Sequence, residues 1–345
     1  MCEKTPQRVE YFDVLRGIAI IGVVAIHSSG VGLQFKDDVY NFHFTVIWRN
    51  LVNFSVPLFL AISGYFLSKK SVGNINDYVL FIKKQVTRVY IPLLFWSFVW
   101  LFLAVFVENK PLSNELVKLV SFQSSAPYYF IALIIQYYLL LPLLKRLNNK
   151  TGLFISALAS IMMALIIFYL RHYTHIKLPL ILYAGNFITW GMFFVLGLCL
   201  NSSMQFKLSN KTMLFLTIIF YALSCVETYV LMNAFHQAEN AVTAVKASSF
   251  LYSFFLIVFL FNRRGVIKPR ILKHIGRISF GIYLIHMFIL LVLPDTLSRL
   301  CPGLQKTTIA YQLSLIVTTI FICYIFILLF NRILSSKASQ FIGFK

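Results

Sequence analysis

Charged residues are scarce in this sequence, and carboxylates are the scarcest of them. Lys, Arg, Asp and Glu make up 12% of the 345 residues, and only 11 residues are acidic. A water-soluble globule of this size needs far more charged surface than that. Apolar residues make up 59% of the chain, and the mean hydropathy is +0.80. The composition therefore predicts that a lipid bilayer surrounds most of the chain.

Other expected signals are also missing. The five cysteines show neither metal-ligand spacing nor a disulfide framework, so we expect no bound metal. The first apolar stretch contains Arg16 and His27, which argues against a cleavable signal peptide and favours a retained span. The net charge of +20 falls in short clusters between apolar stretches, which is typical of topology signals. We therefore expect no nucleic-acid partner.

Apolar stretches long enough to cross a membrane recur along the whole chain. A helix needs about 20 mainly apolar residues to span the hydrocarbon core. The predicted fold is all-α, a polytopic transmembrane helical bundle of about ten spans. They lie near residues 11–30, 43–67, 88–107, 127–144, 152–171, 181–200, 212–232, 246–262, 278–294 and 308–331. Without a repeat or a soluble insertion, residues 1–345 are predicted to form a single integral-membrane domain.

The basic residues predict the orientation of these spans. If the N-terminus is cytoplasmic and the spans alternate, 22 of the 31 basic residues fall on the cytoplasmic side and 9 on the other. Cytoplasmic loops carry such an excess of Lys and Arg. Both termini are therefore predicted to be cytoplasmic.

The first span carries the densest polar signal. Arg16 and His27 are 11 residues apart, so about 100° per residue returns them to within roughly 20° of one helix face. Asp13 lies one turn before Arg16 on nearly the same face. Charges inside a span are costly unless they pair or face water, so this stripe is predicted to face the bundle interior. The alternatives are a structural Asp13–Arg16 ion pair and a hydrogen-bonded interface histidine.

Two further clusters follow. Within the second span, Pro57 is predicted to kink the helix, and Ser63-Gly64 allows close backbone approach; helix packing is the alternative to a binding role. Where the third span begins, Lys84 and Arg88 could hold phosphates, the alternative being lysines that extend to the interface.

Single polar or aromatic residues mark three later spans. Tyr129 opens the fourth span, and Glu227 is a lone carboxylate near the end of the seventh. Such an intramembrane carboxylate is a functional candidate, or else it lies at the interface. His286 in the ninth span is more often a structural histidine.

Taken in order, these motifs resemble those of the membrane-bound acyltransferase-3 family over nearly the whole chain. The similarity rests on Tyr11-Phe12-Asp13-Val14-Leu15-Arg16-Gly17-Ile18-Ala19 with His27, on Phe59 to Tyr65, on Arg88 to Pro92, on Tyr129-Phe130, and on Ser279 to His286. In one respect the chain departs from the pattern, because Gln85 stands where the family often has a second arginine.

The resemblance implies a bacterial cytoplasmic-membrane O-acyltransferase that uses acetyl-CoA or another acyl-CoA as donor substrate and holds no permanent cofactor. It implies His27 as the essential residue, as general base or acyl carrier, with Arg16 functional and Asp13 orienting it. Arg88, Lys84 and Arg16 would hold the donor. The acceptor, a hydroxyl of an extracytoplasmic glycan or glycolipid, would meet the residues Glu227, Tyr129, Ser63 and Tyr65.

Two other functions stay open at this point. The first is a transporter for an anionic metabolite or glycan precursor, with Arg16 as counter-ion; the second is a non-catalytic membrane partner. Against the transporter, no repeat relates the two halves of the chain. Lipid, acyl-CoA and the glycan acceptor are the expected partners, and homo-oligomerisation is left open.

Overall fold

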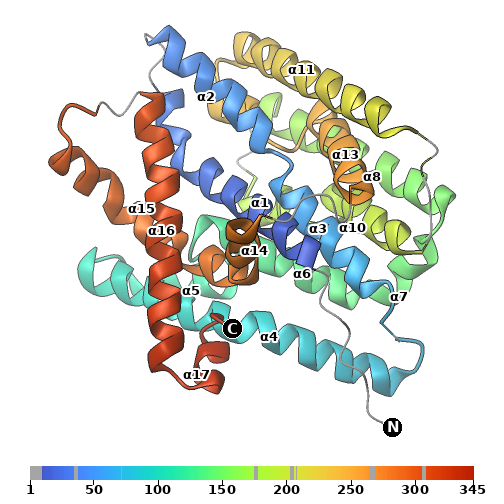
Figure 1. The fold of residues 1–345 in the computed structure, drawn as a ribbon, viewed down its shortest axis with the longest axis horizontal. Helices are drawn as coiled ribbons and strands as arrows, with labels where there is room; N and C mark the ends of the chain where they lie inside the picture. The colour runs from blue at the N-terminus through green and yellow to red at the C-terminus, as the bar shows by residue number, and fades with distance from the viewer. Residues whose placement is uncertain are drawn as a thin grey trace.

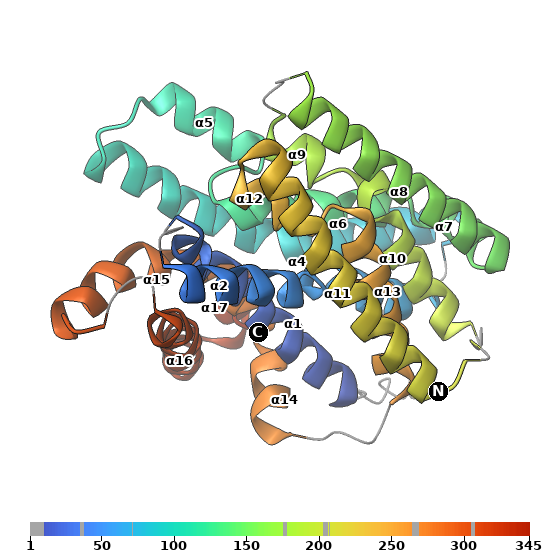
Figure 2. The same cartoon turned by 90° about the horizontal axis from the view of Figure 1, so that it is seen from above.

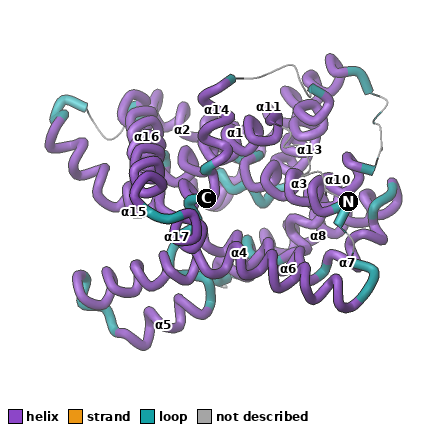
Figure 3. The backbone as a smooth tube through the Cα atoms, turned by 60° about the horizontal axis from the view of Figure 1, so that its bottom comes forward, coloured by secondary structure: helices purple, strands orange, loops and turns teal. Residues whose placement is uncertain are grey.

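The computed structural model describes residues 10–34, 38–70, 72–174, 178–202, 206, 208–263, 269–304 and 308–345. Within these ranges the chain forms helices joined by loops and no strand, which confirms the predicted all-α class (Figure 3). The main helices are α1 (Glu10–Ser28), α2 (Val39–Val52), α3 (Ser55–Leu67), α4 (Ile75–Phe102), α5 (Leu112–Val120), α6 (Tyr129–Leu139), α7 (Leu141–Leu144), α8 (Lys150–His172), α9 (Leu180–Tyr183), α10 (Phe187–Asn201), α11 (Asn210–Phe235), α12 (Ala238–Ala241), α13 (Ala247–Asn262), α14 (Arg270–Arg277), α15 (Ser279–Leu300), α16 (Ile309–Ile333) and α17 (Ser336–Phe341).

Each of the ten predicted spans falls on an apolar helix, but these helices differ in length. Seven described segments are long and apolar enough to cross a membrane: Glu10–Ser28, Val39–Leu67, Ile75–Val107, Lys150–His172, Asn210–Phe235, Ser279–Leu300 and Ile309–Ile333. An eighth candidate is the pair Ala126–Leu139 and Leu141–Leu147, which meet at 66°. The sixth and eighth predicted spans are the shorter helices α10 and α13, of 15 and 16 residues. The chain is thus a polytopic helical membrane protein with seven or eight helices of full spanning length.

The orientation of the chain stays a prediction. Eight of the basic residues in the charge count lie outside the described residues: Lys4, Arg8, Lys36, Lys177, Lys207, Arg264, Lys268 and Lys306.

Large apolar side chains cover the outside of the bundle. Figure 2 shows α15 and α16 on one side of the molecule and α8 and α11 on the other. These peripheral helices expose residues such as Phe154, Phe215 and Phe321, each more than 60% exposed. In water such surfaces would drive association, whereas hydrocarbon solvates them. The outer surface is therefore the one that a bilayer covers.

The second predicted span, which falls on Val39–Leu67, is interrupted next to Pro57, in agreement with the predicted kink. The interruption separates α2, which ends at Val52, from α3, which begins at Ser55. Pro57 thus lies in the first turn of α3, where a missing backbone N–H leaves no hydrogen bond unmade. The break places the polar residues Arg49 and Asn53 beside the end of α1.

The short helix α10 lies at the centre of the bundle between α3 and α8. It begins at Phe187 rather than near residue 181, because Asn186 caps it by accepting a hydrogen bond from the Thr189 N–H at 2.9 Å. Twelve of its fifteen residues are buried. A helix enclosed by protein need not match the bilayer thickness, which explains its length. A Cβ on Gly64 would lie 2.1 Å from the Phe194 carbonyl oxygen, so the close approach predicted at Ser63-Gly64 occurs there.

Candidate active site

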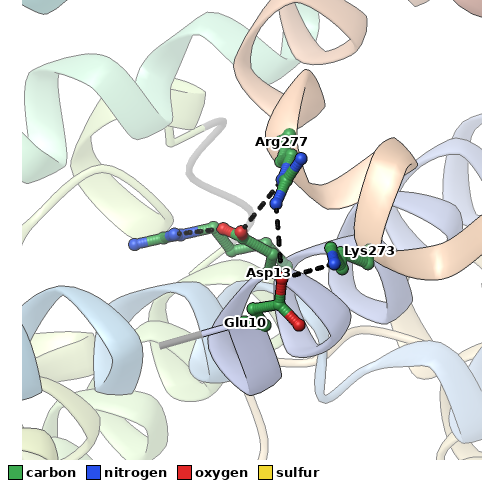
Figure 4. A network of polar contacts seen from close by, with 5 residues as sticks. Glu10, Asp13, Lys273 and Arg277 are labelled. Atoms are coloured by element: carbon green, nitrogen blue, oxygen red, sulfur yellow. Dashed lines mark hydrogen bonds and ion pairs between the residues drawn. The ribbon is translucent and has the colours of Figure 1, made fainter. Parts of the chain in front are cut away.

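The N-terminal end of α1 holds a network of ion pairs. Asp13 is fully buried, and its carboxylate accepts a hydrogen bond from Arg16 Nη1 at 3.1 Å. Arg277 of α14 approaches the other carboxylate oxygen at 3.5 Å, and Lys273 pairs with Glu10 at 2.5 Å (Figure 4). The ion pair predicted between Asp13 and Arg16 is therefore present. Arg277, which the sequence did not indicate, completes it.

Two glycines let α14 reach this network. Figure 1 shows α14 crossing α1 near the middle of the molecule. A Cβ on Gly276 would lie 1.6 Å from the Asp13 carbonyl oxygen, and one on Gly17 would lie 2.2 Å from the Leu272 carbonyl oxygen. The backbones of the two helices are thus in direct contact. This contact fixes the position of Asp13, and through it that of Arg16.

His27 lies at the other end of α1, about 16 Å from Arg16 at 1.5 Å rise per residue. Its ring centroid is 5.4 Å from that of His286 on α15. No described residue forms a hydrogen bond with either ring nitrogen of His27. The imidazole is therefore available to a bound molecule.

His286 is fully buried and has a defined tautomer. Its Nδ1 lies 2.9 Å from the Tyr283 carbonyl oxygen and 3.1 Å from that of Ile282. Carbonyl oxygens only accept, so Nδ1 carries the proton and Nε2 is left as an acceptor. Nε2 is buried and has no partner among the described residues. The ring next to His27 thus carries an unpaired acceptor nitrogen.

Two cavities meet at His27. The Arg16 cavity, of about 260 Å³, extends from His27 toward Arg16 and is lined by apolar residues and by Ser279 and Tyr283. The Arg49 cavity, of about 390 Å³, lies at the C-terminal end of α1 and is lined by Arg49 and Arg171. Both cavities have Ile26, His27, Val56 and Tyr129 in their walls. A molecule in either cavity can therefore reach the same imidazole.

A third cavity, the Arg88 cavity, lies near the N-terminal end of α1. Its volume is about 200 Å³, and its basic lining residues are Arg88, Arg277 and Lys345. Phe280 lines both this cavity and the Arg16 cavity. Residues 342–345 reach it by folding back, with Trp96 Nε1 donating to the Ile342 carbonyl at 2.9 Å. Arg277 and Lys345, which lie far from Gln85 in the sequence, thus supply the positive charge that an arginine at position 85 would have supplied.

A buried polar network supports one wall of the Arg49 cavity. Lys246 Nζ donates to Asn50 Oδ1 at 2.9 Å, to the Ser224 carbonyl at 3.0 Å and to the Ala241 carbonyl at 3.1 Å. The Asn53 amide donates to the Val242 carbonyl at 3.2 Å. These bonds connect α2, α11, α12 and α13. They hold residues 242–245, which line the cavity.

The structure places only some of the predicted site residues together. His27, Arg16 and Tyr129 line the Arg16 cavity, and Arg88 lines the Arg88 cavity. Lys84 is exposed on α4 and is not part of the Arg88 cavity wall.

The remaining three predicted residues line neither cavity at His27. Glu227 lines a neighbouring cavity of about 160 Å³, which shares Arg171 with the wall of the Arg49 cavity, and it accepts hydrogen bonds from Ser248. Ser63 donates to the Phe59 carbonyl at 2.9 Å, and Tyr65 stacks on Phe12 at 4.6 Å. For Ser63, this contact agrees with the packing alternative.

Sequence reasoning missed Arg49 and Arg171. Arg49 lies inside an apolar stretch, which is the signal that could have found it, because intramembrane cations are functional candidates. Arg171 lies in the last turn of the apolar helix α8 and resembles an ordinary terminal arginine.

The comparisons with known proteins show the family of the chain. The model of a family described as an acyltransferase domain matches residues 9–328, nearly the whole chain. No curated protein and no solved structure matches the chain. The matched range contains both histidines, Arg16 and all the helices that position them. The chain belongs to the acyltransferase-3 family, and it is a multi-pass membrane acyltransferase.

Proposed function

We propose that this acyltransferase moves an acyl group, most commonly acetyl, from acyl-CoA to a hydroxyl of a glycan or glycolipid. The observation that carries the proposal is the position of His27 where the Arg16 and Arg49 cavities meet. A transferase needs two substrates to meet at one catalytic group. Two cavities that share the wall around His27 provide that meeting point.

The donor would occupy the Arg88 and Arg16 cavities. Its phosphates would lie among Arg88, Arg277 and Lys345, because guanidinium and ammonium groups bind phosphate oxygens. Its pantetheine arm would pass Phe280 and follow the apolar Arg16 cavity toward His27. Extended CoA covers the distance of about 16 Å between Arg16 and His27. Lys84, being outside the cavity wall, would contribute only at long range.

In the proposed reaction His27 is the general base. It takes the proton of the acceptor hydroxyl as the oxygen attacks the thioester carbonyl carbon. The tetrahedral intermediate then breaks its C–S bond, and the proton on His27 passes to the departing CoA sulfur. An ester replaces the thioester, and no further reactant is needed. Asp13 and Arg277 would hold Arg16 in place at the donor end.

An alternative route passes through an acyl-histidine, in which His27 itself attacks the thioester and later transfers the acyl group to the acceptor. The two routes differ in kinetics. The acyl-histidine route releases CoA in a burst without acceptor, whereas the general-base route does not.

The charge distribution supports a cytoplasmic donor side. The Arg88 cavity lies at the end of the bundle that the basic residues predict to be cytoplasmic. In a bacterial cytoplasmic membrane the Arg49 cavity would then open outside, where the glycan or glycolipid acceptor is found. Membership of an acyltransferase family disfavours a transporter.

The test is transfer by the purified chain in lipid nanodiscs, with radiolabelled acetyl-CoA and surface glycan from a strain lacking the gene. We expect label in alkali-labile ester on the glycan. Succinyl-CoA in a parallel reaction tests acyl length. Labelled CoA that stays intact with every acceptor fraction would refute the proposal.

A further inference from the structure

The Arg49 cavity contains more positive charge than the described chain neutralises. Both Arg49 and Arg171 line it together with His27. Neither guanidinium lies within 4 Å of a carboxylate of any described residue. Of the described residues, one carboxylate, Glu239, lines the cavity, and it is exposed. An unneutralised guanidinium in a membrane protein is costly unless it binds a ligand or faces water.

Arg49 is held so that part of its guanidinium stays unsatisfied. Its Nη1 donates to the Ile26 carbonyl, next to His27. Its Nε is buried and has no hydrogen-bond partner among the residues described. Buried donors of this kind usually find a partner, and one left open marks the place of a missing acceptor.

Arg171 is fixed in one orientation before any ligand binds. Its Nη2 donates to Asn240 Oδ1, and its guanidinium carbon lies 4.5 Å from the centroid of the Tyr183 ring. Stacking and a neutral amide partner orient the guanidinium but do not cancel its charge. The side chain is therefore arranged to bind an anion.

The rest of the cavity suits a sugar ring. Its volume of about 390 Å³ lies within the range of small-molecule sites, roughly 300 to 1,000 Å³. Tyr129, Tyr183 and Trp190 contribute aromatic rings to its walls. Such rings bind the apolar face of a ring-shaped ligand while leaving its hydroxyls to polar partners.

We propose that the acceptor carries an anionic group, a carboxylate or a phosphate, which Arg49 and Arg171 hold while its hydroxyl lies at His27. This inference rests on the proposed function, because it names the class of acceptor for the same site. An acidic sugar and a sugar phosphate share this chemistry. Either would neutralise the excess charge of the cavity.

Binding of three matched methyl glycosides tests the inference. The wild-type chain in nanodiscs, without donor, is titrated calorimetrically with methyl glucoside, methyl glucuronide and methyl glucoside 6-phosphate. We expect at least one anionic glycoside to bind about tenfold tighter than the neutral one, as a charge-assisted hydrogen-bond pair predicts. Stronger binding of the glucuronide indicates an acidic sugar, and stronger binding of the phosphate indicates a sugar phosphate.

Variants of Arg171 test the residue itself. Arg171→Ala should reduce the ratio of anionic to neutral affinity to about one. Arg171→Lys should keep part of it, because the charge stays while the planar fork is lost. The matched control is Arg299→Ala, since Arg299 is exposed at the end of α15 and outside every cavity described above. If Arg171→Ala does not fold, the test rests on the ratio of anionic to neutral affinity that is measured for Arg171→Lys.

Equal affinity of the wild type for the three glycosides, or binding of none of them, overturns the inference. A preference for anions that both Arg171 variants keep in full overturns it as well. Failure of the proposed function looks different. In that case the anion preference is present in the binding assay, but acetyl-CoA stays intact with every acceptor.

Discussion

Gly276→Ala tests whether the contact between α14 and α1 sets the geometry of the site. Alanine is a better helix former than glycine, so helix propensity alone predicts a stabilisation of about 1 kcal/mol. The structure predicts the opposite sign. The added Cβ would lie 1.6 Å from the Asp13 carbonyl oxygen and 2.8 Å from the Gly17 nitrogen, both of which are backbone atoms.

The magnitude follows from these distances. Ordinary contact begins at 3.4 Å, so the two helices must separate by nearly 2 Å. Overpacking of this kind costs about 1–3 kcal/mol. The separation also stretches the contact of Arg277 with Asp13, which is already 3.5 Å long. Asp13 is buried, so the loss of one cationic partner adds to the destabilisation.

Thermal unfolding in detergent and the KM for acetyl-CoA are the two measurements. We expect a lower unfolding midpoint and a higher KM, because Arg277 lines the Arg88 cavity. The matched control is Gly303→Ala, where an added Cβ meets nothing within 4 Å. A Gly276→Ala protein as stable as the wild type, with an unchanged KM, would refute this reasoning.

Three further predictions concern single side chains. Arg277→Ala should raise the KM for acetyl-CoA more than Lys84→Ala does, because Arg277 lines the Arg88 cavity and Lys84 does not. Steady-state kinetics would show this, and equal effects on the KM would contradict it. His286→Ala should lower kcat and alter the pH–rate profile with little change in the KM for the donor, since its ring centroid lies 5.4 Å from that of His27 and its buried Nε2 has no partner among the described residues; an unchanged profile would assign His286 to packing. Lys246→Met should lower the unfolding midpoint by leaving buried acceptors unpaired, at about 1–3 kcal/mol, whereas exposed Lys110→Met should not.

The features predicted correctly from the sequence depend on local spacing. The Asp13–Arg16 ion pair follows from a separation of three residues on one helix. The interior position of His27 follows from helical periodicity and from the cost of charge in a membrane. Tyr129, predicted to open the fourth span, is the first residue of α6 and lines both cavities at His27. Each of these depends on one helix at a time.

Features that depend on tertiary contacts could not be predicted. Arg277 reaches Asp13 across 264 positions, and Lys345 reaches the Arg88 cavity because the chain folds back. Lys84 lies one turn before Arg88 on the same helix. Lys84 is nevertheless exposed, and α4 begins at Ile75, well before the predicted start at residue 88. No local pattern in the sequence encodes these outcomes.

The break at residues 53 and 54 shows a similar limit. The sequence predicted one span kinked at Pro57, but it did not predict the contacts made at the break. Asn53 donates there to the carbonyls of Val242 and Thr243. This partner segment lies about 190 residues away in the sequence, so no local pattern indicates it.

The most direct measurement of the central claim is the release of CoA thiol from acetyl-CoA, with glycan acceptor present, by wild-type and His27→Ala protein in nanodiscs. His274→Ala is the matched control, because His274 is exposed on α14. The proposed role of His27 predicts acceptor-dependent release by the wild type and the control, and none by His27→Ala at an unchanged unfolding midpoint. Full activity of a folded His27→Ala protein would contradict it.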